Sequence, residues 1–352
     1  MPDTVKRLLK AGHDVSVELD AGALAGFPDA LYQEVGAELT TRSEILQADL
    51  VAGVRIGPDS GITPGSTIVG LLKPLERPEF IATLANDNVT AIAFETVPRT
   101  TLAQSMDALS SQANIAGYQA VLVGAVRLQR LLPMMTTAAG TVKPAQLLVL
   151  GVGVAGLQAI ATGRRLGAVV SAFDVRSDVS EQVESLGATF VKNSLEDHTD
   201  QGGYATELGD NDQSRVIRGL APFVAESDVV ICTAQIPGRQ APLLIDDKSL
   251  SGMKVGAVIV DLASATGGNT TQTPKTGESV VGGVTVIAGG QMVSGVAQDA
   301  STLLGRNLVA LVEHLYADDS DLDLEDEIAD GAVVAAAGSV RHPRVISLLE
   351  GE

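Results

Sequence analysis

The stretch LLVLGVGVAGLQA, residues 147–159, joins an apolar strand-like run to a helix-like run through three glycines. Gly151, Gly153 and Gly156 form the pattern G-x-G-x-x-G. In a strand–turn–helix unit the first glycine allows a tight turn, the second lets the backbone approach a pyrophosphate, and the third lets the helix pack on the strand. The helix N-terminus then faces the anion. The stretch therefore predicts a Rossmann domain that binds a dinucleotide; the alternative is a Rossmann-like fold that binds none.

An acidic residue lies at the end of the next predicted strand. Asp174 ends the run VVSAFD, 18 residues after Gly156. A carboxylate at this point accepts hydrogen bonds from the adenosine ribose and repels a 2′-phosphate, which favours NAD over NADP. Arg176 complicates this interpretation, because a guanidinium could pair with a 2′-phosphate.

Strand-like and helix-like runs alternate along most of the chain, which predicts parallel sheets. A length of 352 residues favours two domains. We predict an α/β protein with two Rossmann-like, doubly wound parallel-sheet domains joined by long helices. Residues 1–110 and 303–352 are expected to form the first domain, because the late helix and the strand-like run 331–338 would return the chain to it. Residues 111–302 are expected to form the NAD(H)-binding domain.

The polar stretch 193–214 has no apolar period and is too long for an ordinary connection, so it is either a functional flap or a disordered segment. The other runs are assigned by their apolar patterns. Strands are expected at 14–19, 48–56, 66–72, 89–97, 146–152, 168–175, 188–192, 227–234, 257–263, 283–289 and 331–338, and helices at 5–12, 78–87, 110–131, 154–167, 178–187 and 301–316.

The composition excludes several classes of function. The formal net charge of −19 and the aromatic content of 3% make nucleic acid a poor partner. The acidity fits either an ordinary soluble acidic protein or adaptation to a high-salt cytoplasm. The single cysteine, Cys232, allows neither an intramolecular disulfide nor a cysteine metal site. The longest apolar run, residues 145–161, is interrupted by glycines, so no transmembrane segment is expected.

Acid–base catalysts are hard to find in this sequence. Its histidines, His13, His198, His314 and His342, lie in no nucleophile or metal spacing, so no metal is expected. A dehydrogenase acting on an alcohol or amine normally needs a general base. Hydride transfer between two nicotinamides needs only positioning and the redox state of the cofactors. The sequence therefore favours the second type of chemistry.

The stretch PRTTLAQSMDALSS, residues 98–111, allows two interpretations. Thr100 or Thr101 could cap a helix whose apolar residues follow at helical spacing. The stripe between these apolar residues carries a cation, an amide, a carboxylate and a hydroxyl, which are Arg99, Gln104, Asp107 and Ser110. The stretch is either a capped surface helix or part of a ligand site.

Several blocks in the same order resemble the NAD(H)-binding alpha subunit of proton-translocating NAD(P)+ transhydrogenase, in the alanine dehydrogenase/transhydrogenase family. The blocks cover nearly the whole chain and are VPRTTLAQSMDALSSQANIAGYQAV, LGVGVAGLQAIATGRRLGAVVSAFDVRSDVSEQVESLGATF, GGYATELG, TAQIPGRQAPLLI and VIVDLASATGGN. The resemblance implies direct hydride transfer between NADH bound here and NADP+ on a partner subunit. It also resolves the ambiguity at Arg176, because the family uses this motif with NAD.

The resemblance assigns roles to individual residues. The nicotinamide end of NAD(H) would be held by Arg99, Gln104, Asp107 and Ser110, with Gln104 aligning the two nicotinamides. The remaining NAD(H)-binding residues would be Gly151, Gly153, Val154 and Gly156 at the pyrophosphate, Asp174, Val175 and Arg176 at the adenosine ribose, Gly203 and Tyr204 in a mobile loop that closes over the nucleotide, and Ala234 and Gln235 beside the nicotinamide.

The resemblance also implies partners. NADP(H) would be bound by an NADP-binding beta subunit, and a membrane-spanning subunit would couple hydride transfer to proton translocation. The chain would be a homodimer, cytoplasmic and attached to the inner face of the plasma membrane only through those partners.

The sequence departs from the family pattern in three places. An opening strand with the pattern GxPKE…RV, about twenty residues, precedes the first helix in the family but not here, and a late-annotated start codon is the expected reason. The loop that carries Gly203 and Tyr204 is somewhat short. The family's IPGK is IPGR here, at residues 236–239.

Two other functions fit the sequence less well. A soluble alanine-dehydrogenase-like enzyme would need a lysine and a histidine at the substrate carboxylate. The corresponding stretches, 51–60 and 69–79, offer Arg55 and Lys73 but no histidine. A non-catalytic NADH-sensing module would need a fused effector domain, which the sequence does not carry.

Overall fold

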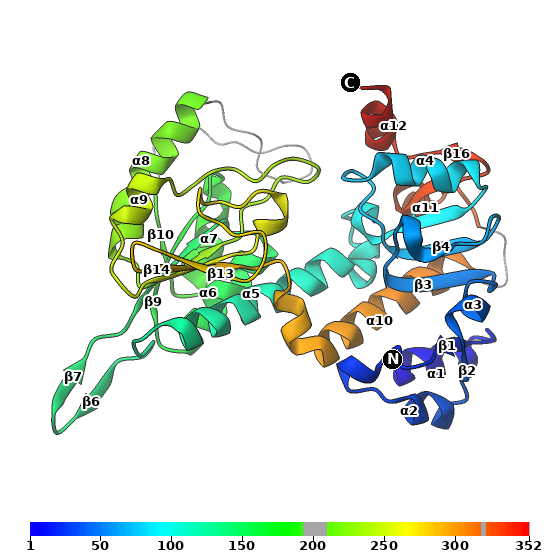
Figure 1. Cartoon of the computed structure of the whole chain (residues 1–352), viewed down its shortest axis with the longest axis horizontal. Helices are drawn as coiled ribbons and strands as arrows, with labels where there is room; N and C mark the ends of the chain where they lie inside the picture. The colour runs from blue at the N-terminus through cyan, green and yellow to red at the C-terminus, as the bar shows by residue number, and fades with distance from the viewer. Residues whose placement is uncertain (193–209, 318–321, 352) are drawn as a thin grey trace. The chain divides into compact units, whose positions relative to one another are not determined.

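The computed structural model describes residues 1–192, 210–317 and 322–351. The chain forms two compact units, Met1–Gln112 with Val296–Glu352 and Ala113–Gly295 (Figure 1). The long helix α5 (Ala108–Arg127) begins in the first unit and continues into the second. The predicted fold, two Rossmann-like α/β domains, is confirmed.

The second unit is built on a seven-stranded sheet in the order β10-β9-β8-β11-β12-β14-β13. The six strands other than β13 are parallel, and their chain order across the sheet is 3-2-1-4-5-6, which is a doubly wound order. The bounds are β8 (Gln146–Leu150), β9 (Val169–Phe173), β10 (Thr189–Phe190), β11 (Val229–Cys232), β12 (Val258–Asp261), β13 (Glu278–Val281) and β14 (Val284–Ala288).

Helices cover both faces of this sheet. Successive side chains of a strand point to opposite faces, so Leu147 and Val149 enter one apolar core and Leu148 and Leu150 enter the other. The first core contains residues of α5, α6 and α7, and the second contains residues of α8 and α9. These helices span Val154–Arg165 (α6), Ser180–Ser185 (α7), Asp210–Glu226 (α8) and Asp247–Ser251 (α9).

The first unit contains a five-stranded sheet in the order β16-β15-β5-β4-β3. Strands β3 (Leu50–Arg55), β4 (Thr67–Leu71) and β5 (Thr90–Ala93) are parallel. Strand β15 (Val333–Ala336) adds antiparallel to β5, and β16 (Ser339–Val340) follows it. A separate two-stranded parallel sheet joins β1 (Ser16–Glu18) to β2 (Glu38–Thr40).

Two apolar cores also flank the five-stranded sheet. Residues of α4 (Pro78–Asn86) and α12 (Pro343–Glu350) pack on one face. Residues of α10 (Ala297–Leu315) and α11 (Glu327–Ala332) pack on the other. The remaining helices are α1 (Pro2–Lys10), α2 (Asp29–Glu34) and α3 (Arg42–Ile45).

Three local expectations were wrong. The helix after Pro98 begins at Ala108, not at Thr100 or Thr101, because a 3₁₀ helix (Leu102–Met106) precedes it. A hairpin of β6 (Met135–Thr137) and β7 (Gly140–Val142) extends from the second unit where the sequence indicated no strand (Figure 1). Helix α8 begins at Asp210, inside the polar stretch 193–214 that was expected to be either a functional flap or a disordered segment.

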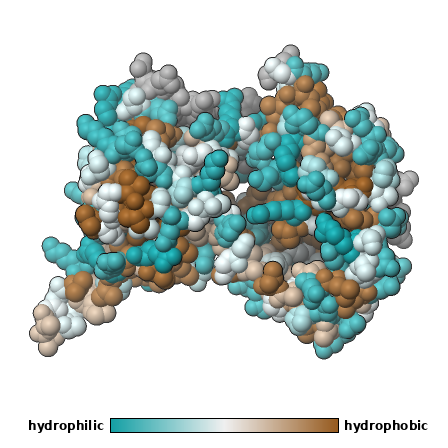
Figure 2. Space-filling model, in the orientation of Figure 1, coloured by the Kyte–Doolittle hydropathy of each residue, from teal (hydrophilic) through white to brown (hydrophobic). Residues whose placement is uncertain are grey.

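The surface mixes polar and apolar side chains. Figure 2 shows hydrophilic residues interspersed with smaller hydrophobic patches on the face in view. Among the described residues, no helix combines the length and apolar character that a membrane span requires.

Candidate functional site

The glycine loop lies where the second-unit sheet reverses its strand order. Strands β8 and β11 are neighbours, and the chain leaves them in connections to opposite sides of the sheet. In such sheets a crevice opens beyond the carboxyl ends of these two strands. Residue 151 follows β8 and residues 233–235 follow β11, so both segments lie at this edge.

Two of the three glycines are required by the fold itself. Gly151 has a φ of +96°, and a Cβ there would lie 2.7 Å from Thr233 Oγ1. At Gly156 a Cβ would lie 2.0 Å from the carbonyl oxygen of Gly151, because α6 packs tightly on the end of β8. Neither position accepts a side chain without a backbone shift.

Gly153 differs from both. It is the N-cap of α6, with φ −82° and ψ −166°, a conformation open to any residue. A Cβ built on it would meet no atom of the described chain within 4 Å. Within the described chain no side chain caps α6, so the first-turn N–H groups are left for a ligand or solvent. Val154 begins the helix at this point.

Asp174 and Arg176 form an ion pair just beyond β9. The Asp174 carboxylate accepts from Arg176 Nε at 2.9 Å, Arg176 Nη2 at 3.0 Å, the Arg176 N–H at 3.0 Å and the Val152 N–H at 2.7 Å. The side chains are 6% and 16% exposed. A carboxylate has about four acceptor positions, so a ribose hydroxyl that binds Asp174 must replace one of these donors. Val175 between them packs against an apolar core.

The segment after β11 is held by a buried asparagine. Asn269, which is 0% exposed, accepts from the Ala234 N–H at 3.1 Å and donates to the Ala234 carbonyl at 2.9 Å. The Gln235 side chain donates to the Leu262 carbonyl at 2.9 Å. This segment is therefore fixed in one conformation at the crevice edge.

A buried carboxylate fixes Asn269 in turn. Asp261 ends β12 and accepts from the Asn269 N–H at 2.6 Å and from Thr273 Oγ1 at 2.5 Å. Burial raises the pKa of Asp261, and the hydrogen bonds to its oxygens partly oppose that rise. Cys232 ends β11 nearby, and burial raises the pKa of its thiol well above the usual value, so this cysteine is a poor nucleophile at neutral pH.

In the first unit, the segment from Arg99 to Ser110 combines a 3₁₀ helix with the start of α5. Asp107 caps α5, because its carboxylate accepts from the Ser110 N–H at 2.8 Å and from the Ser110 hydroxyl at 2.5 Å. Arg99 and Gln104 are exposed. Thr100 does not cap the helix, and its hydroxyl is buried without a hydrogen-bond partner among the described residues.

The carboxyl ends of β3, β4 and β5 carry a second group of charged residues that includes one the sequence did not single out. Glu95 follows β5 and accepts from the backbone N–H groups of Leu72, at 3.2 Å, and Lys73, at 2.9 Å. Burial raises the pKa of Glu95. Lys73 has a φ of +56°, and Arg55 ends β3.

The predicted site residues thus fall into two sets. Arg99, Gln104, Asp107 and Ser110 belong to the first unit. The second unit carries Gly151, Gly153, Val154, Gly156, Asp174, Val175, Arg176, Ala234 and Gln235. Gly203 and Tyr204 lie outside the described residues.

Histidines and metal ligands give no competing site in the portion of the chain that the structure describes. His314 Nε2 lies 3.0 Å from Asp326 Oδ1, and His342 is the N-cap of α12. No group of three or more His, Cys, Asp or Glu residues there could hold a metal ion.

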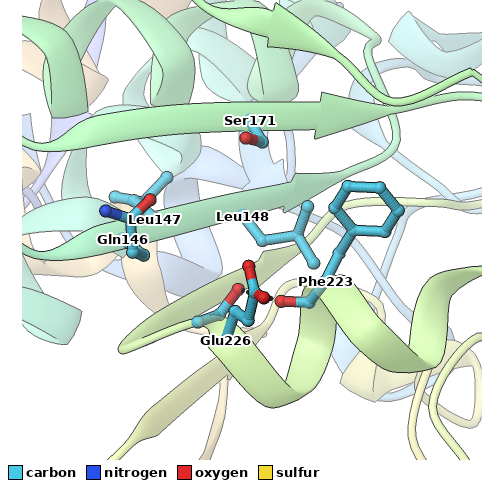
Figure 3. Close-up of a pocket in the computed structure, with 7 residues that line it drawn as sticks. Gln146, Leu147, Leu148, Ser171, Phe223 and Glu226 are labelled. Atoms are coloured by element: carbon cyan, nitrogen blue, oxygen red, sulfur yellow. Dashed lines mark hydrogen bonds between the residues drawn. The ribbon is translucent and has the colours of Figure 1, made fainter.

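A small cavity of about 30 Å³ lies at the opposite, amino-terminal edge of the second-unit sheet (Figure 3). It is lined by Gln146 at the start of β8 and by Phe223 and Glu226 at the end of α8. A cavity of this size has room for little more than water, so it is too small for a nucleotide.

The sheet order, the glycine loop and the acidic residue after the second strand define the class: an α/β protein with a Rossmann domain of the dinucleotide-binding type. Residues 1–116 match the N-terminal domain, and residues 120–343 the C-terminal domain, of the family described as Alanine dehydrogenase/PNT. The chain therefore belongs to the alanine dehydrogenase/PNT family, which implies NAD(H) binding.

Within this family, the chain is similar over nearly its whole length to transhydrogenase alpha subunits. The chain is 41% identical to a Rhodospirillum rubrum protein described as the first part of NAD(P) transhydrogenase subunit alpha, over 97% of this chain and 93% of the relative. It is 39% identical to the protein of the same description from Rickettsia prowazekii, over 96% and 91%. The expected resemblance to transhydrogenase alpha subunits is confirmed.

Two solved structures of similar fold carry the names of the same two kinds of protein, a transhydrogenase and an alanine dehydrogenase. A transhydrogenase from Sinorhizobium meliloti superposes with a TM-score of 0.85 at 40% identity, covering 97% of this chain and 94% of that one. An L-alanine dehydrogenase superposes with a TM-score of 0.79 at 25% identity, covering 100% and 94%.

Proposed function

We propose that this chain is the NAD(H)-binding subunit of a proton-translocating transhydrogenase. NADH bound here would transfer hydride directly to NADP+ on a partner subunit. The relatives described as the first part of subunit alpha support a role as one component of a larger complex.

One observation carries the nucleotide portion of the proposal. Gly153 is the glycine of the loop that neither its φ nor its neighbours require. A methyl group there would meet no atom of the described residues within 4 Å, beside an α6 N-terminus that no described side chain caps. A pyrophosphate that approaches the backbone closely explains this glycine, because the helix N-terminus attracts the anion.

The paired charges after β9 support NAD rather than NADP. The Arg176 guanidinium is bound through both Nε and Nη2 to the Asp174 carboxylate. Its charge is therefore neutralised locally and is not presented to a 2′-phosphate. The ambiguity that the sequence left open thus has an electrostatic explanation besides the family resemblance.

In the first unit, Arg99, Gln104, Asp107 and Ser110 are proposed to hold the nicotinamide end of NAD(H), and Ala234 and Gln235 of the second unit to lie beside it. Arg99 and Gln104 have exposed side chains, as residues that meet a ligand or a partner need. Asp107 and Ser110 are held in a fixed pair at the start of α5. These groups would position a ring and would move no proton themselves.

The proposed partners follow from the same resemblance. An NADP-binding beta subunit would present NADP+, and a membrane-spanning subunit would couple the reaction to proton translocation. This chain would act as a homodimer on the cytoplasmic face of the membrane. Gly203 and Tyr204 would belong to a loop that closes over the nucleotide.

Alanine dehydrogenation is the competing activity, because an L-alanine dehydrogenase shares the fold. The geometry disfavours it. Arg55 and Lys73 lie at the carboxyl ends of β3 and β4, but the neighbouring ionisable group at the end of β5 is Glu95, and no histidine ends these three strands.

The decisive experiment mixes the purified chain with its NADP-binding partner, NADPH and an NAD+ analogue. The reduced form of the analogue must absorb at a wavelength different from that of NADPH. We expect reduction of the analogue by NADPH that requires both proteins. Reduction of NAD+ by L-alanine with this chain alone would instead establish the dehydrogenase. NADH binding without transfer in the reconstituted mixture would indicate a sensing module.

A further inference from the structure

A buried amide on α10 contacts the segment proposed to hold the nicotinamide. Asn307 is 7% exposed. Its Nδ2 donates to the Ser105 carbonyl at 2.8 Å, and its Oδ1 accepts from the Ser111 hydroxyl at 2.7 Å. Ser105 follows Gln104 directly, and Ser111 follows Ser110 directly. The two hydrogen bonds therefore hold the segment at both ends of the Asp107 turn.

Apolar side chains also join the segment to α10. Ala103, Met106 and Ala108, the buried residues of the segment, join one core with Leu311 of α10. Apolar contact alone is not directional, so it would tolerate small shifts of the segment along α10. A buried amide does not tolerate such shifts, because a buried donor or acceptor that loses its partner has no water to replace the hydrogen bond. Both hydrogen bonds of Asn307 therefore form at only one position of the segment along α10.

We propose that Asn307 is a positioning residue that fixes the orientation of Gln104 and Asp107 for hydride transfer. The inference rests on the proposed function, because it assumes that this segment holds the nicotinamide. Asn307 itself would touch neither cofactor nor substrate. A geometric error of about 1 Å in a hydride-transfer site can cost about a hundredfold in rate.

A purely structural role would give a different result. The adenosine and pyrophosphate contacts proposed for NADH belong to the second unit and do not involve Asn307. Loss of positioning should therefore slow transfer far more than it weakens NADH binding. A loss of stability alone should change neither the rate of hydride transfer nor the NADH affinity of the molecules that remain folded.

The test compares Asn307→Ala and Ser111→Ala with Leu315→Ala in the reconstituted complex. Leu315 lies about two turns further along α10, in the same apolar core, and is 5% exposed. Thermal unfolding measures stability, NADH fluorescence measures affinity, and single-turnover absorbance measures transfer. The chain has no tryptophan, so it adds no tryptophan background to the NADH signal.

We expect transfer to slow at least about tenfold in Asn307→Ala, with an NADH dissociation constant within about threefold of wild type. Ser111→Ala is a milder change and should slow transfer by a smaller factor. The double variant should be no slower than Asn307→Ala alone, because both changes remove one shared interaction. Leu315→Ala should lose stability while its folded fraction transfers hydride at the wild-type rate.

Two outcomes would overturn the inference while leaving the proposed function intact. One is an active wild type with unchanged transfer in both Asn307→Ala and Ser111→Ala. The other is slowing by Leu315→Ala equal to that by Asn307→Ala. A wild-type chain that binds NADH and transfers no hydride with its partner refutes the proposed function, and the role of Asn307 falls with it.

Discussion

Replacing Gly153 by alanine separates the folding role of the glycine loop from its ligand role. The backbone at Gly153 suits alanine, and the new methyl would meet no atom of the described chain within 4 Å. Alanine allows the unfolded chain fewer conformations than glycine does, which stabilises the folded state by about 0.4–1 kcal/mol. Alanine is also a poorer N-cap than glycine, which destabilises the folded state by about the same amount. The two effects nearly cancel, so the free energy of unfolding should stay within about 1 kcal/mol of wild type.

If the loop binds the pyrophosphate as proposed, the same methyl would occupy the space that the pyrophosphate needs against the backbone. We expect the NADH dissociation constant of Gly153→Ala to rise at least about tenfold, which is about 1.4 kcal/mol of binding free energy. Fluorescence titration with NADH measures the affinity. Denaturant unfolding of the same preparation confirms that the variant is folded.

Gly156→Ala is the matched control, since it changes the same loop by the same methyl. Its Cβ would lie 2.0 Å from the Gly151 carbonyl oxygen, so the backbone must move. We expect a loss of stability of about 3 kcal/mol or more. A Gly153→Ala variant that is stable and binds NADH as tightly as wild type would refute the assignment of this loop to the pyrophosphate.

Three further outcomes follow from the described contacts. Asp174→Asn removes the charge that neutralises Arg176, so the ratio of NADH to NADPH affinity should fall about tenfold in competitive titrations; an unchanged ratio would count against the pairing argument. Gln104→Ala alters an exposed side chain, so unfolding should shift by no more than about 0.5 kcal/mol while single-turnover hydride transfer slows at least about tenfold; normal transfer would remove Gln104 from the site. Burial raises the pKa of Glu95 above 4.5, so its stabilising contribution is full below that pH and is lost as the pH rises through the folded-state pKa. Glu95→Gln stays neutral and should flatten that decline in thermal melts from about pH 4 to pH 8, whereas parallel wild-type and variant curves would contradict the shift.

Most strands of both main sheets could be predicted because they are buried, whereas the partly exposed strands β13 and β16 were not predicted. Residues 146–152 and 257–263, for example, are near-continuous apolar runs, as parallel strands covered on both faces require. The hairpin Met135–Val142 was missed because its strand residues are all exposed, so no apolar pattern marks them. The start of α5 was misplaced because threonine and aspartate are both good caps, and only the contact between Asp107 and Ser110 decides between them.

The candidate site was predictable to the extent that its chemistry is local in sequence. The glycine pattern and Asp174 lie within one strand–helix–strand unit, so their spacing alone indicates a dinucleotide. Asn307 and Asn269 could not be found in this way, because their partners lie 202 and 35 residues away. A polar residue on the apolar side of α10 is the sequence signal that marks Asn307.

Both segments proposed to meet the nicotinamide are held by asparagine amides, in addition to the carboxylates of Asp107 and Asp261. Asn307 and Asn269 each donate and accept one hydrogen bond toward the segment that they hold. An amide offers both roles at once and does not titrate, whereas a carboxylate only accepts and a histidine changes its roles with pH. The hydrogen bonds that the two amides make to these segments therefore do not depend on the protonation of the amides themselves. That property suits a chain whose proposed task is to align a ring for hydride transfer while protons move through a separate membrane partner.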